Sequence, residues 1–281
     1  MNHTEDFFEI HVGGHLAGMR LDQIMATRVS RRFARRLIEA GAVFVDRVRV
    51  KVASRPIRSG SVVRAPFALP EPSPAVDPGT WILHQDPAFL IVNKPAGWAT
   101  APTPHGDRSI VTELQKKVGP LWVVSRLDFH TSGVLPLVRD RSRLESFEKL
   151  LRSEACEKIY VAMTRRMAFD ESMLDGPIGP HPERRQRYSV RRDGRPAITE
   201  VLSVEPRSED RQLVTLRLHT GRTHQIRVHL AQAGAPVIGD PWYPVGQAQS
   251  GGPMLLHALR LAWTSPEFGN AVFEVPPPWE T

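Results

Sequence analysis

The chain has 281 residues, of which 41% are hydrophobic and 24% are charged, with 25 prolines and a formal net charge of +7. This composition supports a folded core of about two domains and excludes a globally disordered chain. No apolar run approaches the ~20 residues that a membrane-spanning helix needs. The lone Cys156 excludes an intramolecular disulfide and a cysteine-only metal site. The acidic opening lacks the pattern of a secretory signal, so we expect a cytoplasmic protein.

Positive charge is concentrated at the start of the chain. Residues 1–66 carry 12 Lys+Arg against 6 Asp+Glu, which leaves 25 against 24 for residues 67–281. One interpretation is a solvated basic helix face with no binding function. The size of the asymmetry instead favours a small nucleic-acid-binding module ahead of a nearly neutral body.

An arginine-rich helix is predicted inside the basic region. Ser30 can cap this helix and Gly41 can end it. Because positions three or four apart on a helix are neighbours, one side gathers Arg28, Arg31, Arg32, Arg35 and Arg36. Another face carries the apolar Phe33, Leu37 and Ile38. Two short strands follow at 43–45 and 48–50, and then a turn at 56–63 that leads into a last strand.

These elements resemble an S4-type RNA-binding module. The resemblance rests on Arg20-Leu21-Asp22, the arginine-rich helix, the strand pair and the turn at 57–63. The family usually has Asn-Gly in its hairpin, where this chain has Asp46-Arg47. The resemblance implies a helix face that binds RNA phosphates. Such contacts contribute affinity and orient the protein on the RNA, but they contribute little sequence specificity. The expected contacts are Arg31, Arg32, Arg35 and Arg36.

A proline-rich segment separates this module from the body of the chain. Prolines stand at positions 66, 70, 72, 74 and 78, and each fixes φ and removes an amide donor. We therefore expect neither helix nor central strand there, but a semi-rigid linker at 67–79. The predicted domains are the module at 1–66 and a second domain at 80–281.

The body predicts an α+β fold with a mostly antiparallel sheet. Helices are expected at 109–118 and at 140–151, the latter after an Asp140 cap. Short strands are expected at 81–83, 89–93, 122–124, 133–135, 159–162, 214–218 and 271–275. These strands outnumber the helices and do not alternate regularly with them, which disfavours a doubly wound fold. The sequence has no P-loop or dinucleotide-binding glycine motif.

Asp128 lies in the polar segment SRLDFHTSG, residues 125–133, between two apolar runs. An acid placed where a buried strand meets a loop is in a usual position for a chemical group. Alternatively, Asp128 caps a turn by accepting amide protons from Thr131 or Ser132. The segment alone leaves both interpretations open.

A second segment, TGRTHQIRVHL at 220–230, combines two arginines and two histidines. Arg222 and Arg227 are five positions apart and need not share a helix face, so one can address phosphate while the other meets a carboxylate. No cysteine or acid lies at metal-ligand spacing from His224 or His229. We therefore expect both histidines to be structural or to contact RNA. Tyr160, in a strand-like run at 157–162, would by itself be a core residue.

Taken together, the body resembles the RluA-type pseudouridine synthases. The resemblance covers about residues 81–275. Its motifs stand in family order at 91–97, 126–128 with 131–133, 158–160, 194–200, 221–229, and 239–240 with Tyr243. It implies isomerisation of a uridine within RNA, in which the N-glycosidic bond breaks and C5 joins C1′. No cofactor and no metal are implied, and a monomer is expected. An S4-type module suits large structured substrates, so the expected substrate is large-subunit ribosomal RNA, with transfer RNA second.

The resemblance also implies roles for individual residues. The catalytic aspartate corresponds to Asp128, its arginine partner to Arg227, and the active-site tyrosine, which stacks on uracil and is implicated in removing the C5 proton, to Tyr160. The target base must leave its stack before it reacts, and Arg126 is expected to hold the displaced strand. Many relatives have histidine where this chain has Ser125, which bears on contacts to the RNA backbone. Further RNA contacts are expected from Arg222 and His224.

Two other interpretations compete with the synthase. One is a non-catalytic RNA-binding or ribosome-assembly factor on the same fold, although an intact set of Asp128, Tyr160 and Arg227 argues against it. The other is a hydrolase that uses Asp128 with His130 or His224. The sequence lacks the G-x-S-x-G elbow that would support that chemistry.

Overall fold

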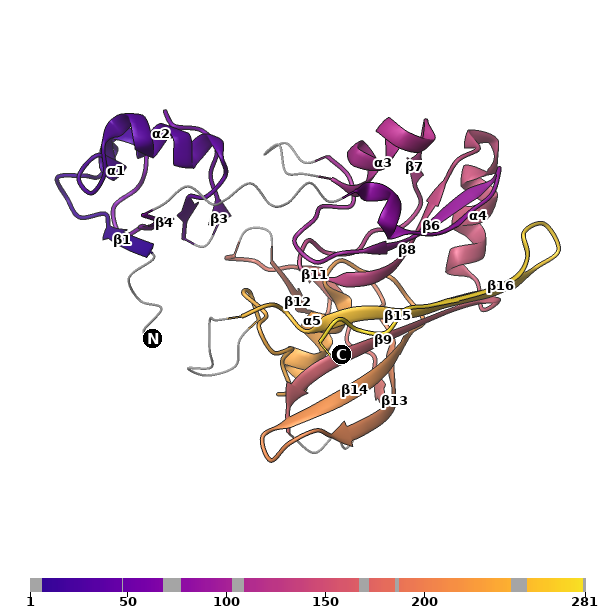
Figure 1. The fold of residues 1–281 in the computed structure, drawn as a ribbon. Helices are drawn as coiled ribbons and strands as arrows, with labels where there is room; N and C mark the ends of the chain where they lie inside the picture. Colours follow the sequence, from indigo (N-terminus) through magenta and orange to yellow (C-terminus); the bar gives the residue numbers. More distant parts are fainter. Residues whose placement is uncertain are drawn as a thin grey trace. The chain divides into compact units, whose positions relative to one another are not determined.

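The computed structural model describes residues 7–46, 48–67, 77–102, 109–166, 172–184, 187–243 and 252–279. The chain forms two compact units, each with a hydrophobic core of its own (Figure 1). Unit 1 contains residues 1–76 and 104–106, and unit 2 contains residues 77–103 and 107–281. The division falls inside the proline-rich segment at 67–79.

Unit 1 packs two helices against a small antiparallel sheet. Its described strands pair in the order β1-β4-β2-β3. Leu21, Ile24, Leu37 and Ile38 are fully buried in the same cluster as the strand residue Val63. The elements are β1 (Phe7–His11), α1 (Leu21–Met25), α2 (Arg31–Glu39), β2 (Phe44–Val45), β3 (Val48–Arg49) and β4 (Val62–Pro66).

The predicted arginine-rich helix is α2. Ser30 caps it, because the Ser30 hydroxyl accepts a hydrogen bond from the Phe33 amide (3.3 Å). Gly41 follows the last turn with φ +68°, a left-handed conformation that glycine adopts without strain. Arg28 precedes the cap, so its placement on the helix is wrong, whereas Arg31, Arg32, Arg35 and Arg36 lie in α2.

The turn between β2 and β3 uses Asp46 where the S4 family usually has asparagine. Asp46 has φ +50°, a conformation that Asn and Asp tolerate better than most residues. Its carboxylate also accepts a hydrogen bond from the Val62 amide (2.8 Å), which ties the turn to β4. Arg47 lies outside the described residues.

The predicted linker is partly structured at its edges. Pro66 is the last residue of β4 and pairs with Phe7, at a strand end where a missing amide donor is tolerated. Pro78 begins a short 3₁₀ helix, η1 (Pro78–Trp81), capped by the carboxylate of Asp77. The prediction of no helix is therefore wrong at this end, and the strand expected from Trp81 begins at Ile82. Residues 68–76 lie outside the described chain.

Unit 2 has the expected α+β fold with a mostly antiparallel sheet. Its main sheet, within the described residues, has the order β10-β13-β14-β9-β15-β8-β6-β5, with β16 on β15 and β7 on β8. The strands of this sheet are β5 (Ile82–Gln85), β6 (Phe89–Lys94), β7 (Trp122–Val123), β8 (Ser132–Val138), β9 (Cys156–Arg165), β10 (Met173–Leu174), β13 (Thr199–Pro206), β14 (Arg211–Leu218), β15 (Leu256–Ser265) and β16 (Gly269–Glu274). A separate pair consists of β11 (Ile178–Pro180) and β12 (Tyr188–Val190).

One row of residues crosses the centre of this sheet. Lys94 on β6 pairs with Gly133 on β8, and Gly133 pairs with Ala258 on β15. Ala258 in turn pairs with Tyr160 on β9. The β8–β15 pairing is the parallel one among the described strands, and Gly133 makes it possible, since a Cβ there would lie 2.2 Å from the Ala258 carbonyl oxygen. Lys94 and Tyr160 therefore lie on the same row of the sheet, on strands either side of β8 and β15.

Three longer helices cover the sheet. α3 (Ile110–Val118) is capped by Ser109 as predicted, since the Ser109 hydroxyl accepts from the Thr112 amide (3.0 Å). α4 (Leu144–Arg152) begins later than predicted, because the Asp140 cap starts a 3₁₀ turn, η2 (Arg141–Arg143), first. α5 (Gln225–Gln232) was not predicted as a helix. In the described part of the chain, no helix combines the length and the apolar character needed to cross a membrane.

Candidate active site

A pocket of about 400 Å³ opens in unit 2 where the row of sheet residues meets α5. Asp128, Tyr160 and Arg227 all line it, although they are far apart in the sequence. Its wall also contains the predicted RNA contacts Arg126, Arg222 and His224. All the residues of unit 2 that the sequence predicted to act in catalysis or RNA binding therefore line one pocket. The remaining predicted contacts, Arg31, Arg32, Arg35 and Arg36, belong to unit 1.

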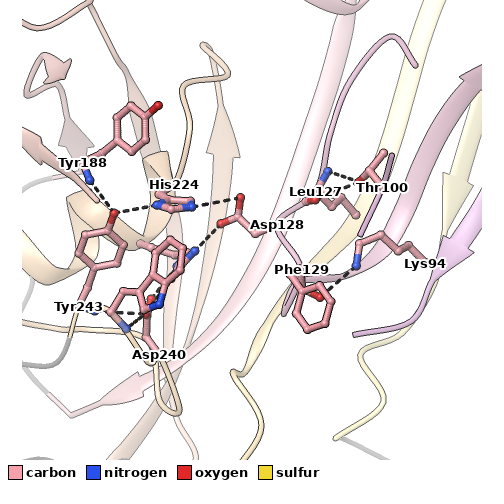
Figure 2. Close-up of polar contacts among 11 residues, drawn as sticks. Lys94, Thr100, Leu127, Asp128, Phe129, Tyr188, His224, Asp240 and Tyr243 are labelled. Atoms are coloured by element: carbon pink, nitrogen blue, oxygen red, sulfur yellow. Dashed lines mark hydrogen bonds and ion pairs between the residues drawn. The ribbon is translucent and has the colours of Figure 1, made fainter. Parts of the chain in front are cut away.

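The loop that carries Asp128 is clamped on both sides of the carboxylate. The Thr100 hydroxyl donates to the Leu127 carbonyl (3.0 Å) and accepts from the Leu127 amide (3.2 Å). The Gly97 amide donates to the Phe129 carbonyl (2.8 Å). Figure 2 shows Asp128 projecting from this clamped loop toward His224. The turn interpretation also has support, but from the main chain, because it is the Asp128 carbonyl that accepts the Thr131 amide (3.1 Å).

Arg227 connects Asp128 to a second carboxylate. Its Nη1 donates to Asp128 Oδ2 (2.7 Å), while Nε and Nη2 donate to the two oxygens of Asp240 (2.7 and 2.9 Å). The Arg227 side chain is 3% exposed, so it points inward from α5, and Arg222 lies outside that helix. Burial opposes its charge, but Asp240 and Asp128 outweigh burial and raise the Arg227 pKa.

Asp240 is itself fixed by its own loop. It accepts hydrogen bonds from the backbone amides of Trp242 (2.8 Å) and Tyr243 (3.2 Å). The rings of these two residues lie against the Arg227 guanidinium, whose carbon is 5.3 and 5.0 Å from the ring centres. Burial opposes ionisation of Asp240, yet Arg227 and these amides lower its pKa. Arg227 is thus locked in place, and Asp128 receives a fixed donor.

His224 faces the other oxygen of Asp128. The Tyr243 hydroxyl accepts from the Tyr188 amide (2.9 Å) and forms a second hydrogen bond with His224 Nδ1 (2.7 Å). Burial lowers the His224 pKa to about 4 despite the opposing charge of Asp128. The ring is therefore neutral near pH 7, and its Nε2 is the nitrogen that faces Asp128. That nitrogen lies 3.9 Å from Asp128 Oδ1, which is too long for a hydrogen bond.

Tyr160 forms part of the pocket wall. It is half-buried on β9 and packs with Ala258 and other apolar residues of the sheet. Burial, followed by the nearby Asp128 charge, raises the pKa of its phenol above the ordinary value. The hydroxyl therefore stays protonated at neutral pH.

Lys94 is a functional candidate that the sequence did not single out. Its side chain is 0% exposed, and its ammonium donates to the carbonyls of Pro95 (3.0 Å) and Phe129 (3.4 Å). Burial lowers its pKa to about 7, while Asp128 opposes that shift. Lys94 lies within the motif at 91–97, but a lysine in a sequence is normally expected at the surface.

The predicted RNA contacts occupy the rim of the pocket. Arg126 is exposed, next to Ser125, which also lines the pocket. Arg222 is half-buried, and its Nε donates to the Pro196 carbonyl (2.8 Å), which orients its terminal amino groups. His229 is structural: its two ring nitrogens contact the Thr199 hydroxyl and the Gly176 carbonyl (2.9 and 2.8 Å).

Asp240, Tyr243 and Tyr188 are the other residues whose roles the sequence did not reveal. Asp240 and Tyr243 belong to a recognised motif, so that motif was the available signal for them. No such signal marks Tyr188, which contributes a backbone amide. Within the ranges that the structure describes, no group of three or more His, Cys, Asp or Glu side chains is arranged to hold a metal ion.

Comparison with known proteins agrees with this geometry. Residues 88–232 match the family described as RNA pseudouridylate synthase, and residues 19–63 match the S4 domain. The chain belongs to the RNA pseudouridylate synthase family. The dual-specificity RNA pseudouridine synthase RluA of Escherichia coli K12 is 34% identical over 211 residues, which cover 73% of this chain and 96% of that protein. An uncharacterised RNA pseudouridine synthase of Chloroflexus aurantiacus is 34% identical over 266 residues, covering 89% and 84%.

A solved structure supports the same assignment. Human RNA pseudouridylate synthase domain containing 1 superposes with a TM-score of 0.59 at 25% identity, over 70% of this chain and 83% of that one. The family and the S4 region predicted from the sequence are thus confirmed, as is the enzyme class, an isomerase. The hydrolase interpretation has no further support.

Proposed function

We propose that this pseudouridine synthase isomerises specific uridines in structured RNA with Asp128 as its catalytic carboxylate. The observation that carries the proposal is the asymmetry of the Asp128 carboxylate. Oδ2 is held by Arg227, whereas Oδ1 faces the pocket at 3.9 Å from His224. One oxygen therefore positions the group, and the other is available to a substrate.

The reaction rearranges bonds within one nucleotide. The bond between uracil N1 and ribose C1′ breaks, the base turns, and C5 bonds to C1′. C5 then loses its proton while N1 gains one, so atoms and charge balance without an oxidant or a second substrate. Asp128 acts on the ribose, either by bonding to C1′ or by assisting loss of the base through a glycal. Both routes use the Asp128 carboxylate, whose Oδ2 accepts a hydrogen bond from Arg227 Nη1 (2.7 Å).

Tyr160 and Arg227 have different roles in this scheme. Tyr160 offers a flat apolar face on which uracil can stack. Because its pKa is raised, it enters the reaction as a neutral phenol. It can take up the C5 proton only if its own proton passes to another acceptor. Arg227 holds Asp128 in the pocket, and Asp240 holds Arg227.

The substrate is proposed to be large-subunit ribosomal RNA, with transfer RNA as the second candidate. The net charge of +6 on residues 1–66 and the S4 domain at 19–63 support a large structured polyanion. The exposed Arg126 and the half-buried Arg222 flank the pocket, where the nucleotides beside a flipped uridine would pass. The neutral His224 ring also lines the pocket, with its Nε2 at 3.9 Å from Asp128 Oδ1, where it can contact the base.

Pseudouridine mapping in cells tests this proposal. Total RNA from cells with and without the gene is treated with carbodiimide and read by primer extension. We expect one or a few signals to disappear without the gene. They should return with the wild-type chain and with Asp210→Asn, an exposed acid outside the pocket, but not with Asp128→Asn.

Two outcomes would overturn the proposal. Recovery of the signals by Asp128→Asn would exclude Asp128 as the catalytic carboxylate. No lost signal in either RNA, together with purified protein that is inactive on both, would instead indicate a binding factor on this fold.

A further inference from the structure

Unit 1 contains a buried carboxylate surrounded by arginines. Asp22 is 0% exposed. Arg20 Nε donates to its Oδ1 (3.0 Å) and Arg20 Nη2 to its Oδ2 (3.3 Å). Arg31 Nε (3.3 Å) and Arg35 Nε (3.0 Å) donate to the same Oδ2. One acid on α1 therefore gathers arginines from two different parts of the chain.

The stoichiometry of this cluster exceeds what neutralisation requires. A buried carboxylate needs compensation, but a single guanidinium would balance its charge. Here three arginines leave the cluster with a net charge of +2. Their side chains are 42, 49 and 50% exposed, so the surplus charge lies at the surface while Asp22 lies beneath it.

The hydrogen bonds also determine which atoms remain outermost. Arg31 and Arg35 reach Asp22 through Nε, the guanidinium nitrogen nearest the chain. These bonds to Asp22 do not use the terminal Nη groups of Arg31 and Arg35. Because all three guanidiniums bond to one carboxylate, they lie close together and repel one another. Such a cluster gains most from an anion that accepts several N–H groups at once, as a phosphate does.

We propose that Asp22 positions Arg20, Arg31 and Arg35 as a preformed binding site for a backbone phosphate of RNA. Arg20, which the sequence did not suggest as an RNA contact, is part of this site. Asp22 acts through the arginines and does not touch the RNA, so it is a positioning residue. The site lies wholly within unit 1, and the inference does not depend on the chemistry proposed for Asp128.

Arg32 and Arg36 provide an internal comparison. They lie on the same helix and are exposed, yet within the described part of the chain neither is a partner of Asp22. We expect them to attract RNA through charge alone, with mobile side chains. Arg31 and Arg35 differ from them in being held in position, which lowers the entropy lost on binding.

Asp22→Asn separates positioning from charge. The substitution raises the net charge of the chain by one, so simple electrostatics predicts tighter RNA binding. Positioning predicts the opposite, because the arginines lose the carboxylate that holds them. We expect the full-length variant to bind a synthetic RNA hairpin roughly tenfold more weakly in fluorescence anisotropy, equivalent to about one charge-assisted contact. Titrations at several salt concentrations should show a shallower salt dependence.

The fold of unit 1 must be checked directly in this variant. All six tryptophans of the chain follow residue 80, so tryptophan fluorescence reports only on unit 2. Hydrogen exchange of the peptides that cover residues 21–39 reports on α1 and α2. Protection equal to wild type, together with weaker binding, supports the proposal. Equal protection with unchanged or tighter binding would overturn it and leave Asp22 a purely structural residue.

Paired arginine variants test the same idea if Asp22→Asn does not fold. Arg35→Gln and Arg36→Gln each remove one positive charge from neighbouring positions of α2. We expect Arg35→Gln to weaken hairpin binding several-fold more than Arg36→Gln. Equal losses would show that charge alone matters and would contradict the site. Where Asp22→Asn does fold, its effect should be non-additive with Arg35→Gln and additive with Arg36→Gln.

Discussion

The two units of this protein use carboxylate–arginine clusters of opposite composition. In unit 1 one buried acid, Asp22, holds three half-exposed arginines. In unit 2 one buried arginine, Arg227, holds two acids, and Asp128 is the more exposed of them at 25% against 1% for Asp240. Unit 1 thus presents cations at its surface, and unit 2 presents a carboxylate in a pocket.

The difference suggests a common rule for both sites. The central buried member of each cluster holds its partners through several hydrogen bonds and fixes the geometry, while the more exposed partner lies where a ligand can reach it. An exposed cation suits phosphate, and an exposed carboxylate suits chemistry on a ribose. The experiments below alter either the buried or the exposed member, and they are ordered by the size of the expected effect.

Removal of the buried arginine should cause the largest change in unit 2. Arg227→Met leaves Asp128 and Asp240 facing each other without a cation. We expect activity to fall by at least about 10³-fold and the free energy of unfolding to fall by about 3–5 kcal/mol. Chemical denaturation and a turnover assay measure the two effects.

Arg217→Met is the matched control. Arg217 also joins two carboxylates, those of Glu157 and Glu200, but its side chain is 37% exposed. Because solvent screens exposed pairs, this substitution should cost about 1 kcal/mol or less. A similar loss of stability in both variants would break the distinction between buried and exposed clusters.

Asp240→Asn should have an intermediate effect. The variant keeps the shape of the side chain but loses the charge that fixes Arg227 through two hydrogen bonds. A small displacement of Arg227 would move Asp128 from its position, which can cost about 10²-fold in rate. We expect the loss in kcat, with little change in KM, since Asp240 does not line the pocket. A change confined to KM would contradict a positioning role.

Lys94 should make activity depend on pH near neutrality. Its pKa of about 7 means that it loses its proton, and its positive charge near Asp128, as pH rises through that value. Wild-type activity should therefore fall as pH rises through about 7, and Lys94→Met should not show this pH-dependent fall. Because the folded pKa lies below the ordinary 10.5, the unfolded chain binds more protons between these values, so Lys94 makes stability increase from pH 7 to 10.5. Activity and stability should therefore change in opposite directions, and a parallel fall would contradict the assignment.

The smallest effect in the series should be the pH dependence of unit 1 stability that Asp22 causes, which appears at acid pH. The hydrogen bond from Arg20, with those from Arg35 and Arg31, lowers its pKa against the opposing effect of burial. A carboxyl with a lowered folded pKa stabilises the protein above its ordinary value of 3.8, and this contribution is lost as pH falls below that value. Hydrogen exchange in residues 21–39 should increase below about pH 4 in the wild type. In Asp22→Asn this pH dependence should be weaker, and an equal dependence would exclude Asp22 as its source.

The sequence predicts features that depend on neighbouring residues. The caps at Ser30 and Ser109 were identified correctly, because a cap hydrogen bond spans only a few positions. Asp140 is also a cap, but of the 3₁₀ turn η2 and not of α4 as predicted. The family motifs also indicated Asp128, Tyr160 and Arg227, which the fold brings to one pocket.

Features that depend on tertiary burial were not predicted. α5 lacks an amphipathic stripe because Gln225, Arg227 and His229 are buried among its apolar residues, each with specific partners. β15 was also missed, since the polar residues within it do not alternate regularly with apolar ones. The Asp22 cluster joins residues that are 9 and 13 positions apart on separate helices. No local pattern indicates such contacts.

Release of the uridine C5 hydrogen tests the central claim most directly. RNA labelled with tritium at C5 of uridine loses that label only when C5 bonds to C1′. We expect release by wild type and by Asp210→Asn. Asp128→Asn should release none above background while binding the RNA with an affinity close to wild type. Release by Asp128→Asn at the wild-type rate would show that the carboxylate presented by Arg227 is not the group that performs the reaction.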